Sequence, residues 1–118
     1  MRLIQYEDGG IAWRPQDSTA YHPDGQIAWR SSDNTAYYDD SEHTLAYRGI
    51  DHTAYYPDGQ LAYRGKDDMT WDEFGEEVGK GYGLNLGIGD HIYLEIDTNG
   101  VKLWVCDEYV YLKVYQYN

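Results

Sequence analysis

The chain has 118 residues and a net charge of −12, from 21 Asp and Glu against 9 Lys and Arg. That length suits a single domain, residues 1–118, with a modest core. The charge disfavours binding to nucleic acid or to anionic membranes and favours a basic protein surface as partner. The first residues lack the apolar run of a signal peptide, and no stretch reaches membrane-spanning length. A lone cysteine, Cys106, excludes an internal disulfide, and we expect a cytoplasmic protein.

Residues 11–65 predict tandem β-hairpins. The segment Ile11-Ala12-Trp13-Arg14 returns three times with small changes, and a Thr-Ala-Tyr segment stands between the copies. The pair formed by Ala and an aromatic residue recurs at intervals of eight residues, with one interval of ten. Its alanines are Ala12, Ala20, Ala28, Ala36, Ala46, Ala54 and Ala62. Eight residues hold a short strand and a tight turn, whereas no helix has that period, so the pattern predicts an antiparallel meander.

Two kinds of turn separate these strands. Pro23-Asp24-Gly25 and Pro57-Asp58-Gly59 fit a type I turn followed by a glycine of positive φ. The other kind carries Asp at its third position, as in Pro15-Gln16-Asp17-Ser18. With Asp24 at the centre of its loop, Ala20 would lie opposite Ala28.

Because every interval is even, no face should flip along the array. One face would then carry the large residues as core: Ile11, Trp13, Thr19, Tyr21, Ile27, Trp29, Thr35, Tyr37, Leu45, Tyr47, Thr53, Tyr55, Leu61 and Tyr63. The other would carry the Ala and Arg residues with His22, Tyr38 and Tyr56, and would face water or a partner.

Residues 66–118 predict a short helix, a Gly-rich segment and C-terminal strands. Thr70 and Glu73 fit a capping box, which predicts about two helical turns ending near Val78. Residues 79–89 predict a loop or weak strand, because the Gly-Lys-Ser/Thr ending and following helix of a phosphate loop are missing. Residues 91–106 predict a hairpin. The expected fold is an all-β antiparallel meander with a C-terminal hairpin region and one short helix.

The last predicted strand covers residues 108–117. On alternation, Val110, Leu112 and Val114 would share one side and cover the aromatic face of the repeats. The other side would carry Tyr109, Tyr111, Lys113, Tyr115 and Tyr117. The domain would then have two layers, or a long sheet curling on itself.

The segments at residues 21–27 and 55–61 carry a family resemblance. Tyr55-Tyr56-Pro57-Asp58-Gly59-Gln60-Leu61 resembles the MORN-variant repeats of antitoxin-like bacterial proteins, and more loosely the YD repeats of large bacterial toxins. The likeness covers about half of the chain, without the Gly-rich half of a MORN repeat and with a shorter period. It implies a repeated β-sheet interaction surface and a toxin-neutralising context, and no catalytic residue.

No catalytic residue, metal site or cofactor is predicted. His22, His43 and His52 occupy turns or strand ends where other copies carry Tyr or Asp, so they fit solvated positions. Cys106 follows a strand and fits a small buried residue better than a nucleophile. The turn aspartates each bring one carboxylate, whereas calcium takes six to eight oxygens. The sequence therefore favours a protein that is not an enzyme.

A binding role fits the pattern best. Regular carboxylates on a rigid sheet could occupy a basic groove, as in inhibitors, immunity proteins, antitoxins and phage anti-defence proteins that imitate nucleic acid. The candidate partner-binding residues are Asp17, Asp33, Asp51, Asp67, Arg14, Arg30, Arg48, Arg64, Tyr38 and Tyr56. The arginines are also expected to pair with turn aspartates or to stack on tyrosines.

Two alternatives stay open at this point. The first is a carbohydrate-binding module, in which a ladder of aromatic rings stacks on sugars. Its residues would be Trp13, Tyr21, Trp29, Tyr37, Tyr47, Tyr55 and Tyr63. The second is a structural, self-assembling β-repeat protein that forms homo-oligomers by burying the Ala face between copies.

Overall fold

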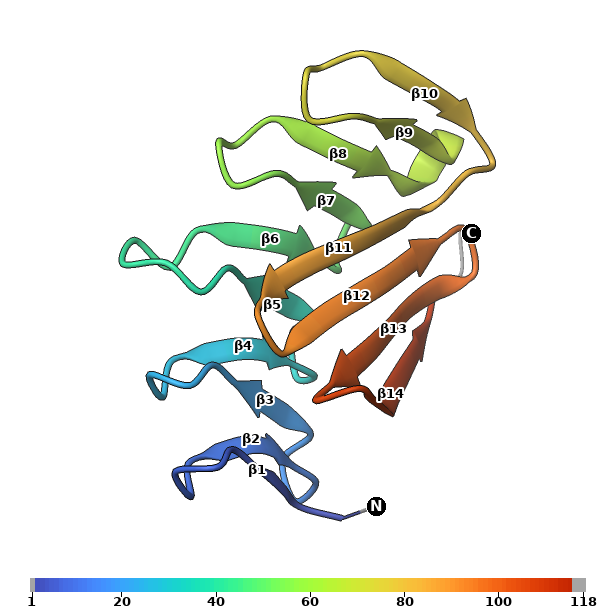
Figure 1. The fold of residues 1–118 in the computed structure, drawn as a ribbon. Coiled ribbons are helices and arrows are strands. Elements are labelled where there is room, and N and C mark those ends of the chain that lie inside the picture. The colour runs from blue at the N-terminus through green and yellow to red at the C-terminus, as the bar shows by residue number, and fades with distance from the viewer. Residues whose placement is uncertain (1, 116–118) are drawn as a thin grey trace.

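The computed structural model describes residues 2–115 and contains two antiparallel sheets (Figure 1). Ten strands follow one another in chain order in the first sheet, and four in the second. The strands are β1 (Ile4–Gln5), β2 (Ile11–Arg14), β3 (Thr19–Tyr21), β4 (Ile27–Arg30), β5 (Thr35–Tyr37), β6 (Leu45–Arg48), β7 (Thr53–Tyr55), β8 (Leu61–Arg64), β9 (Met69–Trp71), β10 (Glu77–Lys80), β11 (Leu84–Gly89), β12 (Ile92–Asp97), β13 (Gly100–Val105) and β14 (Glu108–Val114). The predicted all-β meander is confirmed. Within the described residues, no helix is long and apolar enough to cross a membrane.

The repeat sheet is longer than the sequence pattern indicates. β1 extends it before residue 11, and β9 and β10 extend it beyond residue 65; β1 forms a hairpin with β2, and β9 forms one with β10. The loop at residues 6–10 repeats the Asp-Gly turn of residues 56–60, and residues 72–76 form a degenerate copy of it. The repeats therefore form ten strands in five hairpins, whereas the Ala-aromatic motif marks only seven strands.

The predicted helix near Trp71 is wrong. Residues 69–71 form β9, which pairs with β8 and β10, and the only helical segment described is the 3₁₀ turn η1 (Gly65–Asp67). The Thr70 hydroxyl, read as a helix cap, instead donates a hydrogen bond to the Gly83 carbonyl at 2.8 Å. Asp72 and Gly75 close a hairpin loop, with Gly75 at a φ of 85°. Tertiary pairing of the strand overrides the local capping signature.

The predicted assignment of faces is also wrong, because each longer repeat strand contains a β-bulge. In the β3–β4 pair, Tyr21 lies opposite Ile27 as expected, but Ala20 lies opposite Trp29 and not Ala28. The β5–β6 and β7–β8 pairs show the same shift. One extra residue on one strand moves the side chains that follow it to the other face. The even spacing of the sequence conceals this change.

The bulges create an inner face that alternates large and small residues. Its members are all buried: Trp13, Ala20, Trp29, Ala36, Tyr47, Ala54, Tyr63 and Thr70. The bulged Ala12, Ala28, Ala46 and Ala62 are buried too, so the Ala residues do not form an open face. The outer face carries the arginines with Tyr21, Tyr37 and Tyr55, which are half-buried. Alternating large and small residues allow a close fit to an opposing layer.

The four-stranded sheet is that opposing layer. It contributes Leu86, Ile88, Ile92, Leu94, Ile96, Val101, Leu103, Val105 and Val110 to one core with the inner face of the repeats. The ring of Tyr111 lies 4.7 Å from that of Trp29. Backbone bonds also join the sheets, since Asp39 N donates to the Ile88 carbonyl at 2.8 Å. Figure 1 shows β11 and β12 crossing in front of the middle repeat strands.

The last strand follows the predicted alternation only in part. A bulge between β13 and β14 places Tyr111 opposite Leu103, on the core side, and Tyr109 opposite Trp104. Val110 is buried as expected, but Leu112 and Val114 are exposed, so their predicted covering role is wrong. Tyr117 lies outside the described residues. The predicted hairpin is confirmed as β12 and β13, and the Gly-rich segment contributes β11.

Candidate interaction surfaces

The repeat strands end in two rows of turns. We call the turns at residues 15–18, 31–34, 49–52 and 65–68 the turn row. We call the loops at residues 6–10, 22–26, 38–44, 56–60 and 72–76 the loop row. Because the sheet is a meander, the two rows lie at opposite ends of the strands (Figure 1).

In the turn row, each arginine forms an ion pair with the aspartate three residues later. The shortest nitrogen-to-oxygen distances are 2.6–2.7 Å, in the pairs Arg14–Asp17, Arg30–Asp33, Arg48–Asp51 and Arg64–Asp67. The hydrogen bond from Arg14 holds the pKa of Asp17 below its usual range, and Arg30 and Arg64 do the same for Asp33 and Asp67. These eight candidate binding residues therefore lie together, on the outer face, with their charges paired.

The same arginines cover aromatic rings of the outer face. The guanidinium carbon of Arg14 lies 5.3 Å from the centre of the Tyr21 ring, and that of Arg64 lies 5.1 Å from the Trp71 ring. Arg48 lies in the same way over Tyr55, at 5.8 Å. Tyr37 differs, because the His43 ring stacks on it at 4.1 Å. The stacking of arginines on tyrosines is expected from the sequence. It leaves these ring faces partly occupied.

The turn row also supplies polar partners to the buried aromatics. The residue after each turn aspartate has a positive φ, and in three of the four turns its side chain bonds the aromatic residue five positions earlier. Asn34 Oδ1 accepts a hydrogen bond from Trp29 Nε1 at 3.2 Å, and Asp68 Oδ1 accepts one from the Tyr63 hydroxyl at 2.8 Å. In the first repeat, Ser18 is too short, and Trp13 Nε1 has no partner among the described residues.

His52 is the most buried of these turn residues. Its Nε2 donates to the Asp97 carbonyl at 2.6 Å, so its Nδ1 accepts from the Tyr47 hydroxyl at 2.5 Å. The ring also stacks on Tyr115 at 4.6 Å. Burial lowers the pKa of His52, because the charged ring would lose its hydration. The expectation that this histidine occupies a solvated position is therefore wrong.

A second set of side chains connects neighbouring repeats. Each belongs to the first residue of a loop and bonds a backbone carbonyl at the end of the strand two later in the chain. The hydroxyls of Tyr6, Tyr38 and Tyr56 donate to the backbone carbonyls of Tyr21, Tyr55 and Trp71 at 2.5–2.7 Å. His22 Nε2 makes the equivalent bond to the Tyr37 carbonyl at 2.8 Å. Tyr38 and His22 are buried, so neither presents its side chain to a partner as predicted for the Ala/Arg face. Tyr56 is partly exposed.

The loop row holds most of the excess charge. It carries ten acids and no Lys or Arg: Glu7, Asp8, Asp24, Asp39, Asp40, Glu42, Asp58, Asp72, Glu73 and Glu76. In the turn row and its flanking arginines, by contrast, five acids are balanced by five bases. None of the loop-row carboxylates takes part in an ion pair within the described residues. The excess negative charge of the protein is therefore concentrated along one end of the repeat sheet.

The sequence pattern did not single out this surface. Asp24 and Asp58 were recognised only as turn formers, which they are, since each carboxylate accepts the backbone N–H two residues later. The first and last loops lack the Pro-Asp-Gly signature, so that signature does not predict them. The available signal is Asp8-Gly9, which repeats the Asp-Gly pair of residues 24–25 and 58–59, together with Gly75 in the last loop.

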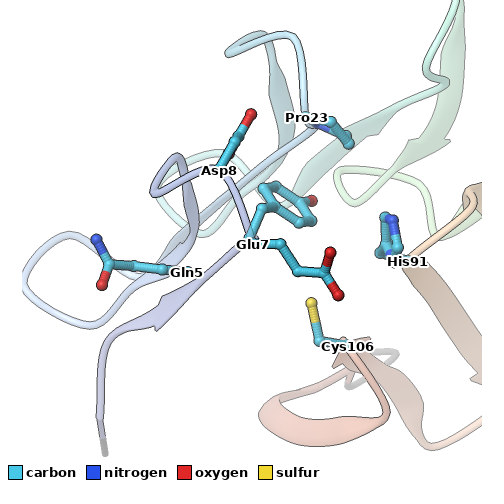
Figure 2. A pocket seen from close by; sticks show the side chains of 7 residues that line it. Gln5, Glu7, Asp8, Pro23, His91 and Cys106 are labelled. Carbon is cyan, nitrogen blue, oxygen red and sulfur yellow. The ribbon is translucent and has the colours of Figure 1, made fainter.

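A cavity of about 550 Å³ lies between the first loop and the four-stranded sheet. Figure 2 shows the side chains of Glu7, His91 and Cys106 around it. Burial, with the charges of Glu108 and Asp107, raises the pKa of the Cys106 thiol. A raised pKa makes the thiolate scarce, so this geometry does not activate a nucleophile. No group of three or more potential metal-binding side chains is found within residues 2–115.

The proposed sugar-stacking ladder is divided between the two faces. Trp13, Trp29, Tyr47 and Tyr63 are 0–1% exposed in the core, where no ring face is available to a ligand. Tyr21, Tyr37 and Tyr55 lie on the outer face beneath Arg or His side chains. The seven rings therefore do not form one continuous platform.

No protein-family model, curated protein or solved structure matches the chain.

Proposed function

We propose that the chain is a non-enzymatic acidic binding protein that occludes a basic partner protein through its loop row. The observation that carries this proposal is the separation of charge between the two ends of the repeat sheet. The loops carry ten acids and no Lys or Arg, whereas four of the five acids of the turn row are paired with arginine. Unpaired surface carboxylates attract a basic protein and accelerate its association.

The regularity of the loops supports the proposal. Successive loops are two strands apart, which corresponds to about 10 Å from one loop to the next. Each loop is fixed by its hairpin, and four of the five also by a Tyr or His side chain bonded to a backbone carbonyl across the repeats. A row of carboxylates held in this way pays little entropy when it meets a matching row of basic side chains. It suits an inhibitor, immunity protein, antitoxin or anti-defence protein that presents negative charge in place of nucleic acid.

The resemblance of the turn segments to MORN-variant repeats of antitoxin-like proteins agrees with this proposal. The carbohydrate alternative has less support, because four of its seven rings are buried and the others are covered. Self-assembly through an open Ala face has less support too, because the Ala side chains are already buried within one chain.

Two quadruple variants with the same net charge test the proposal. The loop variant is Asp8→Asn, Asp24→Asn, Asp58→Asn and Glu73→Gln. The matched control is Asp17→Asn, Asp33→Asn, Asp51→Asn and Asp67→Asn in the turn row. Binding of a fluorescent oligolysine is measured by anisotropy over a salt series. We expect the loop variant to lose at least tenfold in affinity and the control to lose less than threefold.

Equal losses in the two variants would overturn the assignment of binding to the loop row. Wild-type affinity that does not fall with ionic strength would contradict charge-driven binding altogether, since exposed charges are screened over about 10 Å at 0.1 M salt. Circular dichroism and urea unfolding of both variants establish that each retains the fold.

A further inference from the structure

The edge of β11 lies open beside the loop row. β11 is the first strand of the four-stranded sheet and pairs only with β12. Leu84 and Leu86 lie opposite Ile96 and Leu94. Because the N–H and C=O groups of alternate residues point to opposite sides of a strand, those of Asn85 point away from β12.

The chain itself demonstrates that this edge accepts a backbone partner. The Ile88 carbonyl, at the far end of β11, receives a hydrogen bond from Asp39 N at 2.8 Å. Before Ile88, the outward backbone groups of Asn85 and Gly87 have no hydrogen-bond partner among the described residues. A Cβ added at Gly87 would meet nothing within 4 Å, so the face of the strand is also uncovered at this residue.

Two adjoining cavities follow this edge. One, of about 460 Å³, is lined by Leu84 and Asn85 on the β11 side and by Tyr56 on the loop side. The other, of about 520 Å³, shares Tyr38 and Gly87 with the first and continues past Ile88. Together they form a groove that follows the six residues of β11. Strands rise about 3.3 Å per residue, so the groove holds an extended segment of four to six residues.

The walls of the groove are negatively charged. Asp58 and Glu73 line the first cavity and Asp39, Asp40 and Asp90 the second, and no Lys or Arg lines either one. The pKa of Tyr38 is raised, first by burial and then by the nearby charges of Tyr56, Asp58, Asp40 and Glu73. The potential in the groove therefore favours a cationic occupant, and the free strand edge favours an extended one.

We propose that the open edge of β11 takes an extended, Lys- or Arg-containing segment of a partner protein as an additional strand. Main-chain hydrogen bonds to Asn85 and Gly87 supply affinity, and basic side chains of the segment meet the carboxylates of the two walls. This inference rests on the proposed function, because it names the part of the basic partner that the loop row attracts.

Amide hydrogen exchange tests the proposal at the atoms concerned. The probe is an eight-residue peptide that alternates Lys with Val and Thr, and the protein is the full chain, followed by NMR. We expect the amides of Asn85 and Gly87 to exchange at least tenfold more slowly with peptide than without it. Amides of β14, at the other edge of the same sheet, should not change.

Two modified peptides separate strand addition from simple charge attraction. N-methylation of alternate residues removes the donors from one edge of the peptide, so one methylated register should lose at least tenfold in affinity and the other should bind normally. Equal binding of both registers would overturn strand addition. A peptide with Glu in place of Lys should not bind, and its binding would overturn the role of the acidic walls.

A matched pair of double variants locates the charges. Asp58→Asn with Glu73→Gln changes the groove, whereas Asp17→Asn with Asp33→Asn removes the same charge from the turn row, at the opposite end of the strands. The first pair of substitutions should weaken peptide binding at least fivefold, and the second pair less than twofold.

The outcomes also distinguish the groove proposal from the proposed function. If the loop variant loses oligolysine binding but peptide does not slow amide exchange at Asn85 and Gly87, the groove proposal alone fails. If no cationic probe binds at all, the proposed function fails with it. Protection that rises with protein concentration in the absence of peptide would assign the edge to a second copy and overturn the proposal.

Discussion

The turn row and the loop row differ in where their side chains point. Both join the same strands, and both are rich in aspartate. In the turn row, the aspartates are paired with arginines and the residues after them reach into the core. In the loop row, the aspartates hold only their own backbone and leave their charge to solvent. One end of the repeat sheet thus has its charges paired, and the other exposes unpaired carboxylates.

Replacing His52 with Ala is expected to have the largest effect on stability. The change removes the acceptor of the Tyr47 hydroxyl and the donor to the Asp97 carbonyl, and it leaves a cavity beside Tyr115. We expect a loss of about 2–4 kcal/mol in the free energy of unfolding, measured with urea. His43→Ala is the matched control in the loop row, because His43 also has a positive φ and also bonds a backbone carbonyl. Its loss should be about 1 kcal/mol, and equal losses would contradict the division between the rows.

The burial of His52 also predicts a dependence of stability on pH. Because the pKa of His52 is lowered in the folded state, the unfolded chain binds the proton more readily. The contribution of His52 is therefore complete above about pH 6.5, the usual pKa of histidine, and is lost as the pH falls below it. Urea midpoints between pH 7.5 and 5 should decline more steeply for the wild type than for His52→Asn. Parallel declines would show that His52 is not responsible.

The turn row and the loop row each contain a position that requires glycine, but for different physical reasons. In the turn row, a Cβ on Gly49 would lie 2.5 Å from the Cβ of Asn34, so Gly49→Ala should cost about 1–3 kcal/mol through overpacking. In the loop row, Gly59 has open space around it but a φ of 90°, so Gly59→Ala should cost about 1–2 kcal/mol through backbone strain. Introducing Asn34→Gly should reduce the cost of Gly49→Ala and leave that of Gly59→Ala unchanged.

The smallest expected effect is a gain. Trp13 Nε1 is buried without a partner among the described residues, and Ser18 occupies the position where Asn34 satisfies Trp29. Ser18→Asn should provide the missing acceptor and suits the φ of 48°, since Asn tolerates that region better than Ser. We expect a stabilisation of about 1 kcal/mol by urea unfolding. The same substitution in a Trp13→Phe background should give a smaller gain, and an unchanged gain would refute the proposed bond.

The hairpins could be predicted from the sequence because their turns carry local signatures. Pro-Asp-Gly fixes its own geometry, and Gly25 and Gly59 have the expected positive φ. The bulge at Ala28 could not be predicted from the spacing of the Ala-aromatic pairs. That spacing stays even although the longer strand contains one extra residue, so it gives no sign that the faces change. The helix expected at Thr70 failed for the related reason that a capping box and a hairpin loop use the same residue types. In both cases the choice depends on pairing with a distant strand.

The sequence predicts which types of residue form the candidate site, but not where in the fold they lie. The sequence identifies every carboxylate, and the pairing of Arg14 with Asp17 follows from the repeated spacing. Which carboxylates are left unpaired depends on which end of the hairpin they occupy, and that requires the order of the strands. The open edge of β11 is harder to predict from the sequence, because it depends on a Gly-rich strand lying beside three separate loops, which contain Asp40, Asp58 and Glu73.

The hydroxyl-to-carbonyl bonds across the repeats have a direction. Each runs from a residue before a loop to a carbonyl two strands later in the chain, so every repeat depends on the one that follows it. At the equivalent position of the last hairpin stands Asp72, whose carboxylate instead accepts the N–H groups of Phe74 and Glu76 in its own loop. Asp72 requires no further strand. The series of bonds across the repeats therefore ends at the last loop, where the side chain turns back to its own hairpin.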